Sequence, residues 1–570
     1  MQLLDLDGGG SSADWHASAD WKLQAVPCKS RPQLVASHVG AALVGALLGA
    51  LLLGGDTARQ PAAEAAASHA GGGEADDRVP EGWLVERLFH EPIRCPWLAD
   101  GAEPDAACVA RVDALTAMGR QLSTCEDPLR RTDKTYGHRG AALVAPEETL
   151  ASFEVAAQSG AAFVECDASV TRDLQLVCRH GTCDLATTTD IVANHPELHA
   201  RCTSPFVPGS GTRATCCTYD FDLAELSELC SVMDGITNAD ATTTEGYLVG
   251  APSFRTDGIG KAKCHKLVSL SEHLGWLRTK RLDAIPELKD TASAGVTAFL
   301  AAQTPPRDCA RTNSPLVRAA ASCARKPRAL TLLRGPAGTF LADLIAAEVS
   351  GAGFTQAWNA DASTHRGYRS ILQTFDHRVA ARWLTTQALS VEYMPSDESI
   401  LAPPLSESQA QKCLSKPSDR CDNVAHLIAL GVDVVAPSIQ HLVQAGPDHT
   451  IVPTEAAQRL RALGASIGSW SAERQGCTDD SSFSQRQPSQ LGPCLHNSGY
   501  YGSTEGSVFQ HIDVLRCVPC CALPRCLSSR LTRCATGSVL DVLFKDVGLV
   551  GMFADFPASV SAYVNCILDQ

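Results

Sequence analysis

The chain lacks the basic excess of a nucleic-acid-binding protein. Its 570 residues hold 48 Lys and Arg against 63 Asp and Glu, a formal net charge of −15, and the basic residues do not cluster. Nucleic-acid binding normally needs a basic footprint, so we expect no nucleic-acid partner. No motif points to a protein partner either. The length suffices for several domains, or for one α/β barrel with insertions.

Zinc-finger motifs and glycosylation sites are also missing. No two Cys-x-x-Cys motifs have zinc-ribbon spacing, and no Asn-x-Ser/Thr site has an allowed middle residue. The chain nevertheless has 24 cysteines, too many for an ordinary reduced cytosolic enzyme. This density indicates disulfides in an oxidising compartment, although the sequence leaves their pairing open.

Charged residues are absent from one long apolar run, residues 32–55. Within it, Leu34–Gly54 is almost entirely Leu, Val, Ala and Gly. About 20 such residues span the hydrocarbon core of a bilayer. The run therefore predicts a single transmembrane anchor. The competing interpretation is a signal peptide that is cleaved, leaving a secreted protein; the long acidic leader and the length of the run favour the anchor.

The bases around this run predict its orientation. Three precede it and one follows nearby: Lys22, Lys29 and Arg31, then Arg59. The positive-inside rule then places residues 1–31 in the cytosol as a short tail. We expect a single-pass type II membrane protein whose domain after the anchor is lumenal or extracellular.

The rest of the chain divides into a linker and one domain. Residues 56–82 are rich in Ala, Gly and acids with little to pack, which predicts a disordered linker. Residues 83–570 are expected to form the domain. Two Cys-rich stretches, about 194–265 and 476–536, interrupt the strand–helix pattern of this domain and are interpreted as insertions. The cysteines of the second stretch could bind zinc, but disulfide-bonded loop cysteines fit an oxidising compartment better.

Short apolar runs alternate with helical patterns from Tyr136 onward. We expect strands at Phe163–Ser169, Leu174–Arg179, Leu282–Leu288, Val432–Ala436, Ala465–Trp470 and Gly548–Ala554. Thr149–Ser159 is typical of a helix, with Thr149 as its cap and Gly160 after its end. Strands alternating with helices imply a parallel sheet, and enough repeats suggest a closed (β/α)₈ barrel, the TIM-barrel fold.

Chemically useful side chains fall near the ends of these predicted strands. In a strand, residues i and i+2 share a face, so Glu165 and Asp167 point the same way, as do Glu287 and Lys289. The C-terminal strand ends of a parallel barrel form its active face. We therefore expect one rim to collect His138-Arg139, Glu165-x-Asp167, Arg179-His180 and Glu287-x-Lys289.

The types of these residues indicate phosphoester cleavage. The three carboxylates of Glu165, Asp167 and Glu287 suit one hard divalent cation, Mg²⁺ or Ca²⁺. Arg139 and Lys289 suit the oxygens of a phosphate. His138 and His180 suit general acid and base roles, which the sequence does not divide between them.

The same residues resemble the glycerophosphodiester phosphodiesterase family. Its hallmarks are His-Arg-Gly, Pro-Glu-Asn-Thr, Ser-Phe, Glu-x-Asp, a later His and Glu-Leu-Lys. Here they stand, in order, as His138-Arg139-Gly140, Pro146-Glu147-Glu148-Thr149, Ser152-Phe153, Glu165-Cys166-Asp167, His180 and Glu287-Leu288-Lys289. The resemblance is strong over residues 135–295 and loose over 355–565, where Gln373-Thr-Phe375, Trp470 and Ala554-Asp555-Phe556-Pro557 look like later strand signatures.

The resemblance implies a TIM barrel that hydrolyses glycerophosphodiesters to sn-glycerol 3-phosphate and an alcohol in glycerophospholipid metabolism. It implies a divalent metal on the three carboxylates and an acid–base pair of histidines, with Glu147 and Trp470 as supporting residues behind them. Glu148 departs from the family's Asn, and the sequence leaves open whether it repels substrate or points outward.

Two other functions remain open at this point. One is a lysophospholipase D or sphingomyelinase D-like lipid phosphodiesterase, which shares the barrel and metal site but takes a substrate with an acyl chain, such as a lysophospholipid. The other is a non-catalytic module that binds a phosphodiester. The presence of all seven expected groups disfavours the second.

Overall fold

The computed structural model describes residues 121, 124–251, 264–291, 293–302, 337–361, 367–415, 418–445, 451–472 and 539–569. All of them belong to one compact unit, Asp77–Gln570. Four predicted features lie outside the described residues: the tail 1–31, the anchor 32–55, the linker 56–82 and the Cys-rich stretch 476–536. Within the described part of the chain, no helix combines the length and hydropathy needed to cross a membrane.

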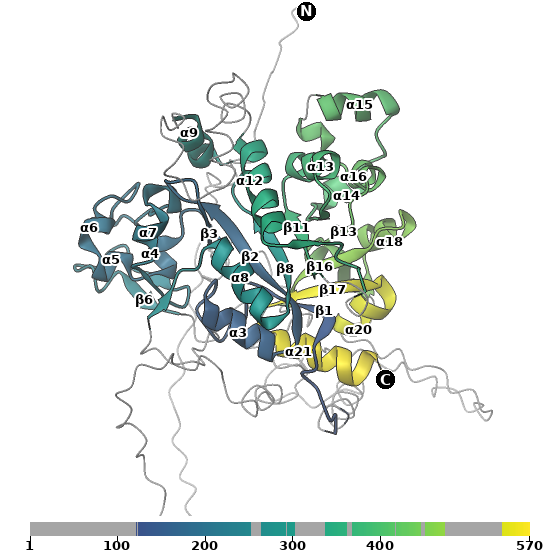
Figure 1. The fold of residues 1–570 in the computed structure, drawn as a ribbon, viewed down its shortest axis with the longest axis horizontal. Coiled ribbons are helices and arrows are strands. Elements are labelled where there is room, and N and C mark those ends of the chain that lie inside the picture. Colours follow the sequence, from purple (N-terminus) through teal and green to yellow (C-terminus); the bar gives the residue numbers. More distant parts are fainter. Residues whose placement is uncertain are drawn as a thin grey trace, which may run out of the picture. The chain divides into compact units, whose positions relative to one another are not determined.

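Eight parallel strands of the described chain close into a barrel (Figure 1). Around the barrel they run β1 (Thr132–Gly137), β2 (Ala161–Val170), β8 (Asp283–Leu288), β11 (Ile371–Thr374), β12 (Ser390–Tyr393), β13 (Val434–Val435), β16 (Ile467–Ala472) and β17 (Leu549–Ala554). Each neighbouring pair is parallel, and β17 pairs back onto β1. The predicted TIM barrel is confirmed.

Helices connect the strands and cover the outside of the barrel (Figure 1). The main ones are α3 (Leu150–Gln158), α8 (Leu270–Lys280), α12 (Ala337–Gly351), α13 (His377–Thr386), α16 (Val424–Leu430), α18 (Glu455–Ala462) and α21 (Pro557–Tyr563). The Thr149 hydroxyl accepts the Ser152 amide at the start of α3, as the predicted cap requires. Other elements are α9 (Ala294–Ala302), α14 (Asp397–Leu401), α15 (Glu407–Ser415), α17 (Ile439–Leu442), α20 (Val539–Asp541), β9 (Phe354–Gln356), β10 (Tyr368–Arg369), β14 (Val443–Ala445) and β15 (Ile451–Pro453).

The alternation of strand residues produces two separate cores. Residues such as Tyr136, Phe163 and Phe553 point inward and pack together inside the barrel. Their neighbours, such as Val164 and Cys166, point outward into the layer beneath the helices. Since β2 carries Glu165 and Asp167 in phase with Phe163, both acids face the barrel interior, as their spacing predicts.

The strand expected at Leu174–Arg179 is not a barrel strand, which corrects the prediction. The observed β3 (Leu176–Cys178) runs antiparallel to the end of β2, with Ala168 opposite Cys178. The β2 strand is ten residues long and extends past the rim, so a tight turn sends the chain back along it. A short apolar run looks the same in either direction, and the sequence therefore did not distinguish a hairpin from a βα unit.

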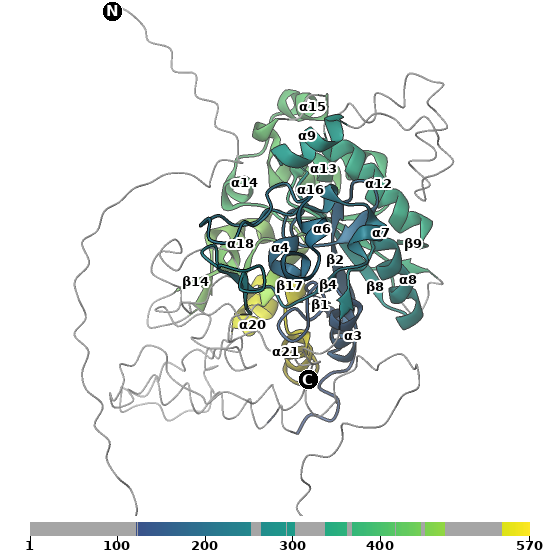
Figure 2. The ribbon, with the colours of Figure 1, turned by 90° about the vertical axis from the view of Figure 1, so that its left-hand side faces the viewer.

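The first Cys-rich insertion forms a lobe that starts at residue 184, just before α4 and earlier than the expected 194. We call residues 184–251 and 264–268 the lobe. Its elements are α4 (Leu185–Thr188), α5 (Ile191–Asn194), α6 (Pro196–His199), α7 (Leu223–Leu226), β4 (Cys230–Ser231), β5 (Ile236–Thr237), β6 (Leu248–Gly250) and β7 (His265–Lys266). It has its own apolar cluster, which includes Phe206, Phe221 and Tyr247. Figure 2, where this side faces the viewer, shows α4, α6 and α7 in front of the barrel.

Six disulfides join described residues, as the cysteine count predicts. Three lie at or within the lobe: Cys183–Cys217, Cys202–Cys216 and Cys230–Cys264. The others are Cys125–Cys566, Cys166–Cys178 and Cys413–Cys421. Cys125–Cys566 ties the segment before β1 to the segment after α21 and so fastens the two ends of the barrel sequence together.

Candidate active site

A tight turn after β1 places His138 and Arg139 at the rim. Arg139 and Gly140 both have positive φ, at 53° and 85°. A Cβ on Gly140 would lie 2.4 Å from the Ser152 hydroxyl oxygen, so only glycine allows α3 to pack this closely. The same turn aims the Arg139 amide at Glu165, whose Oε2 accepts it at 2.9 Å. The His-Arg-Gly sequence is therefore needed for geometry as well as for chemistry.

Three buried carboxylates meet beside this turn. Asp167 on β2 is the direct cross-strand partner of Glu287 on β8, and Glu165 lies one inward position earlier on β2. One oxygen from each of the three lies within 4.8 Å of the others. The predicted convergence of Glu165, Asp167 and Glu287 is what the structure has.

Two cations face these acids. Arg139 Nε lies 3.3 Å from Asp167 Oδ2, and Lys289 Nζ lies 3.6 Å from Asp167 Oδ1 and 2.6 Å from Glu287 Oε1. Burial alone would raise the pKa of Asp167, but Lys289 and Arg139 hold that pKa below its ordinary value. Burial raises the pKa of Glu287 to about 7, against the lowering effect of Lys289. For Glu165, burial and the charge of Asp167 both raise the pKa.

His138 is held by a carboxylate that sequence reasoning missed. Its Nδ1 lies 2.5 Å from Asp555 Oδ1, and its Nε2 lies 3.8 Å from Glu165 Oε2. Burial lowers the pKa of His138, but the charges of Glu165 and then Asp555 outweigh it and raise that pKa well above the ordinary value. Asp555 directly follows β17; the signal for it was Ala554-Asp555-Phe556-Pro557 at the end of the last strand.

His180 reaches the same rim by way of the β2–β3 hairpin. The Arg179 amide donates to the Asp167 carbonyl at 2.7 Å, and the Ser169 hydroxyl donates to the Arg179 carbonyl at 3.0 Å. The buried Arg179 guanidinium donates to the Glu147 carbonyl at 2.6 Å. His180, which is half-buried, therefore follows a residue whose backbone is fixed to Asp167.

Of the two expected supporting residues, Glu147 contacts Arg139 directly and Trp470 contacts Phe375, whose ring lies beside Lys289. The Glu147 carboxylate accepts from Arg139 at 3.5 Å. Trp470, on β16, meets the ring of Phe375 edge to face at 5.3 Å. Phe375 is 47% exposed, and its ring lies 5.6 Å from Lys289 Nζ. The rim thus carries an accessible aromatic group next to a cation.

Glu148 points inward, so the alternative that it points outward is wrong. It is fully buried with a φ of 60°, and its Oε1 accepts the Asp167 amide at 3.1 Å. This φ lies in the left-handed region that Asn tolerates better than Glu, which explains the family's usual residue. Burial and then the charges of Asp167 and Glu165 raise the pKa of Glu148 well above its ordinary value.

The three converging carboxylates fit a hard divalent cation. Glu165 Oε1 and both oxygens of Asp167 are buried without a hydrogen-bond partner among the described residues. All the donor atoms are carboxylate oxygens, the ligand type that Mg²⁺ and Ca²⁺ prefer. A second group, Glu148 with Cys166 and Cys178, also has metal-ligand spacing, but its two cysteines are bonded to each other and offer no thiolate.

The comparison with protein families agrees with this geometry. Residues 138–301 match the model of the glycerophosphoryl diester phosphodiesterase family. The match begins at His138 and includes the Glu-x-Asp and Glu-Leu-Lys sequences. The resemblance read from these residues is confirmed.

Curated relatives match this chain over short stretches. An "Extracellular protein" of Arthroderma benhamiae is 26% identical over 145 residues, which is 25% of this chain and 44% of that protein. A Mycobacterium tuberculosis protein named "Probable glycerophosphodiester phosphodiesterase 1" is 54% identical over 43 residues, 8% of this chain and 16% of its own. The chain therefore spans less than half the length of both relatives.

Solved structures of phosphodiesterases are also similar to this chain. An Oleispira antarctica phosphodiesterase, solved in complex with the product sn-glycerol 3-phosphate, is 14% identical with a TM-score of 0.33. The likeness covers 77% of this chain and 97% of that one.

Proposed function

We propose that this chain is a glycerophosphodiester phosphodiesterase, which hydrolyses a glycerophosphodiester to sn-glycerol 3-phosphate and an alcohol. The observation that carries the proposal is one buried rim where Glu165, Asp167 and Glu287 meet Arg139 and Lys289. The charge pattern suits a cation next to an anionic phosphate. His138, on the first strand turn, stands at its edge.

Arg139 and Lys289 bind the non-bridging phosphate oxygens in this proposal. Both are already paired with Asp167, so their charged ends are held in place before substrate arrives. Such pre-positioned charge stabilises the negative charge that builds up in the transition state. A divalent cation held by Glu165, Asp167 and Glu287 would neutralise a further phosphate oxygen.

The two histidines transfer the protons. One removes the proton of the attacking hydroxyl, either of water or of the neighbouring glycerol hydroxyl, and the other protonates the leaving alkoxide oxygen. Asp555 accepts from Nδ1 of His138, which fixes the ring and leaves Nε2 turned toward Glu165 and the rim. We therefore assign the proton transfer of His138 to Nε2.

A lipid phosphodiesterase of the lysophospholipase D or sphingomyelinase D type is the second candidate. The exposed ring of Phe375 beside Lys289 favours it, because an acyl chain needs apolar surface near the phosphate site. An N-terminal anchor at residues 32–55 would keep such a substrate within reach. We propose a type II orientation with a lumenal or extracellular catalytic domain, which the disulfides support; secretion after cleavage of that run is the alternative.

The test is hydrolysis by the full chain, produced under oxidising conditions, measured as release of glycerol 3-phosphate from the glycerophosphodiesters and as release of the head-group alcohol from the lysophospholipid. Substrates are glycerophosphocholine, glycerophosphoinositol and a lysophospholipid, each with Mg²⁺, Ca²⁺ or EDTA. We expect metal-dependent release from a glycerophosphodiester, lost in Glu165→Gln and retained in the matched control Glu197→Gln on the exposed surface of the lobe. Cleavage of the lysophospholipid alone would select the second candidate. Absence of turnover with all substrates, from folded protein, would favour a non-catalytic binding module.

A further inference from the structure

The loop that carries His180 is crosslinked on both sides. Cys178 precedes the histidine and is bonded to Cys166, and Cys183 follows it and is bonded to Cys217. Cys166 stands between two of the metal-site carboxylates on β2, whereas Cys217 belongs to the lobe. The short segment between Cys178 and Cys183 is thus attached to the barrel at one end and to the lobe at the other.

We propose that the Cys183–Cys217 disulfide positions His180 for catalysis. The inference rests on the proposed function, in which His180 transfers a proton. Neither cysteine needs to touch the substrate; both act as positioning residues through the backbone of the loop. The lobe would then be part of the catalytic apparatus, because one side of the His180 loop depends on it.

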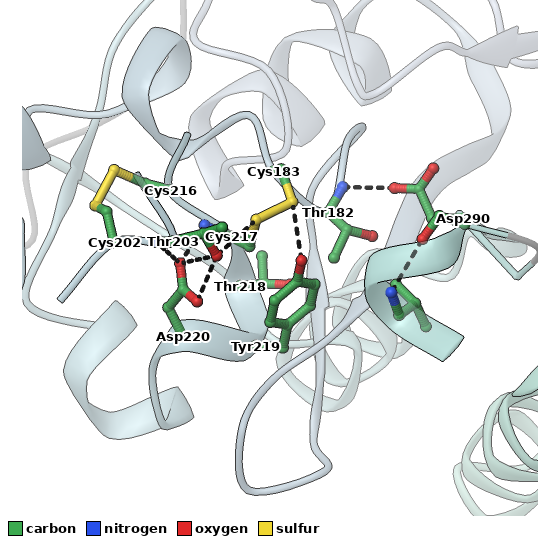
Figure 3. Close-up of a disulfide and its surroundings, with 12 residues drawn as sticks. Thr182, Cys183, Cys202, Thr203, Cys216, Cys217, Thr218, Tyr219, Asp220 and Asp290 are labelled. Carbon is green, nitrogen blue, oxygen red and sulfur yellow. Dashed lines mark hydrogen bonds between the residues drawn. A yellow bond between two sulfur atoms is a disulfide. The ribbon is translucent and has the colours of Figure 1, made fainter. Parts of the chain in front are cut away.

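Hydrogen bonds around the crosslink join the loop to the lobe and to the end of β8 (Figure 3). The Thr182 amide donates to Asp290 Oδ2 at 2.8 Å, and the Thr218 amide donates to the Thr182 carbonyl at 2.7 Å. Asp290 directly follows Lys289. The backbone after His180 is therefore fixed from the lobe side and from the end of β8 at once.

Tyr219 extends the same connection to α9, the helix that follows Lys289. Its hydroxyl donates to Cys183 Sγ at 3.6 Å, and its ring stacks on Phe299 at a centroid distance of 5.2 Å. A Cβ on Gly295 would lie 2.6 Å from the Tyr219 hydroxyl oxygen, so this glycine leaves the room that Tyr219 occupies. The disulfide, Thr182 and Tyr219 together bind the His180 loop to the segment that carries Lys289.

The neighbouring disulfide supplies a matched control. Cys216 and Cys217 are adjacent, but Cys216 bonds to Cys202 and stays within the lobe, while Cys217 bonds to the His180 loop. Loss of either bond removes one crosslink from the lobe. Only loss of Cys183–Cys217 frees the catalytic loop. A purely structural role predicts the same effect for both bonds, and a positioning role predicts different effects.

The experiment compares two double variants of the full chain, Cys183→Ser with Cys217→Ser and Cys202→Ser with Cys216→Ser. For glycerophosphocholine we expect the first pair to lower kcat by about 10- to 10²-fold, since a displacement near 1 Å has effects of that order. KM should change less than about threefold, because the phosphate-binding Arg139 and Lys289 are untouched. The His180→Ala variant should lose one limb of the pH–rate profile. That limb should be weaker than in wild type when Cys183 and Cys217 are replaced, and unchanged when Cys202 and Cys216 are replaced. Equal kcat in both pairs would overturn the proposal.

A second variant covers the case in which the first pair does not fold. Asp290→Ala removes the acceptor of the Thr182 amide and leaves all disulfides in place, so it should lower kcat in the same direction. Normal kcat in Asp290→Ala would then contradict the proposal. Hydrogen–deuterium exchange over residues 176–190 separates this inference from the proposed function. If wild-type protein hydrolyses no phosphodiester, the proposed function has failed; if exchange there is equally slow in both Cys pairs, the positioning role has failed.

Discussion

The barrel has two unlike halves. Strands β17, β1, β2 and β8 form the site half, in which the inward acids face a histidine, a cation or a backbone amide: Asp555 with His138, Glu165 with the Arg139 amide, and Asp167 and Glu287 with Lys289. Strands β11, β12, β13 and β16 form the apolar half, whose inward residues include Ile371, Met394, Val434 and Ala436.

One carboxylate in the apolar half shows how charged partners affect the pKa of a buried acid. Glu392 on β12 is fully buried, and neither of its oxygens has a hydrogen-bond partner among the described residues. Burial and then the charge of Glu287 raise its pKa to about 8, so it is mostly neutral at pH 7. Asp167, equally buried, has a lowered pKa because two cations face it. Because both carboxylates are buried, the two cations beside Asp167 account for the opposite directions of these two pKa shifts.

The largest effect is expected where both cations meet. Asp167→Asn removes a carboxylate oxygen of the proposed metal site and the shared partner of Arg139 and Lys289. We expect metal-dependent release of glycerol 3-phosphate to be abolished. The loss in rate should be at least about 10³-fold, which is the upper end of the range for removal of one charge-stabilising group. Turnover of glycerophosphocholine with and without EDTA measures it, with the thermal midpoint as a control for folding. Unchanged turnover would remove Asp167 from the metal site.

The next largest effect is expected at His138. His138→Ala should lower kcat by about 10³-fold, within the range for loss of a general acid or base. The rest of the site half keeps its charges, so KM should change little. A kcat within a few-fold of wild type would make His138 a structural residue, and the proton transfer would have to be reassigned.

Asp555 should have a smaller effect, through His138. Asp555→Asn keeps the shape but removes a negative charge that raises the pKa of His138. We expect kcat to fall by about 10- to 10²-fold, as for other residues that orient a histidine from behind. Because this charge raises the pKa of His138, its loss should lower that pKa. The limb of the pH–rate profile that belongs to His138 should therefore move to lower pH. A limb that stays in place would show that Asp555 does not control this histidine.

The site half could be read from the sequence to a large extent, because its signals are local. Glu165 with Asp167 and Glu287 with Lys289 follow from i, i+2 spacing on single strands. The His138–Asp555 contact joins residues 417 apart, and only closure of the barrel brings them together. The Cys125–Cys566 disulfide joins residues 441 apart and is a long-range contact of the same kind. In the apolar half, β12 was missed because its four residues give too short a pattern.

The smallest effect on activity, and the one that tests the apolar half, is expected at Glu392. The pKa of Glu392 is about 8 in the folded protein, against 4.5 for an ordinary Glu. Between these two pH values the folded state keeps a proton that the unfolded state has released. The stability of the wild-type protein should therefore fall as pH rises through this window, by up to about 1.4 kcal/mol per pH unit. Glu392→Gln has no such proton, so its stability relative to wild type should increase from pH 5 to pH 8, while kcat at pH 7 changes less than about threefold. Urea unfolding across that range measures the difference. If the stabilities of wild type and Glu392→Gln changed in parallel with pH, Glu392 would be ionised in the folded protein. The apolar half would then carry a buried charge, as the site half does.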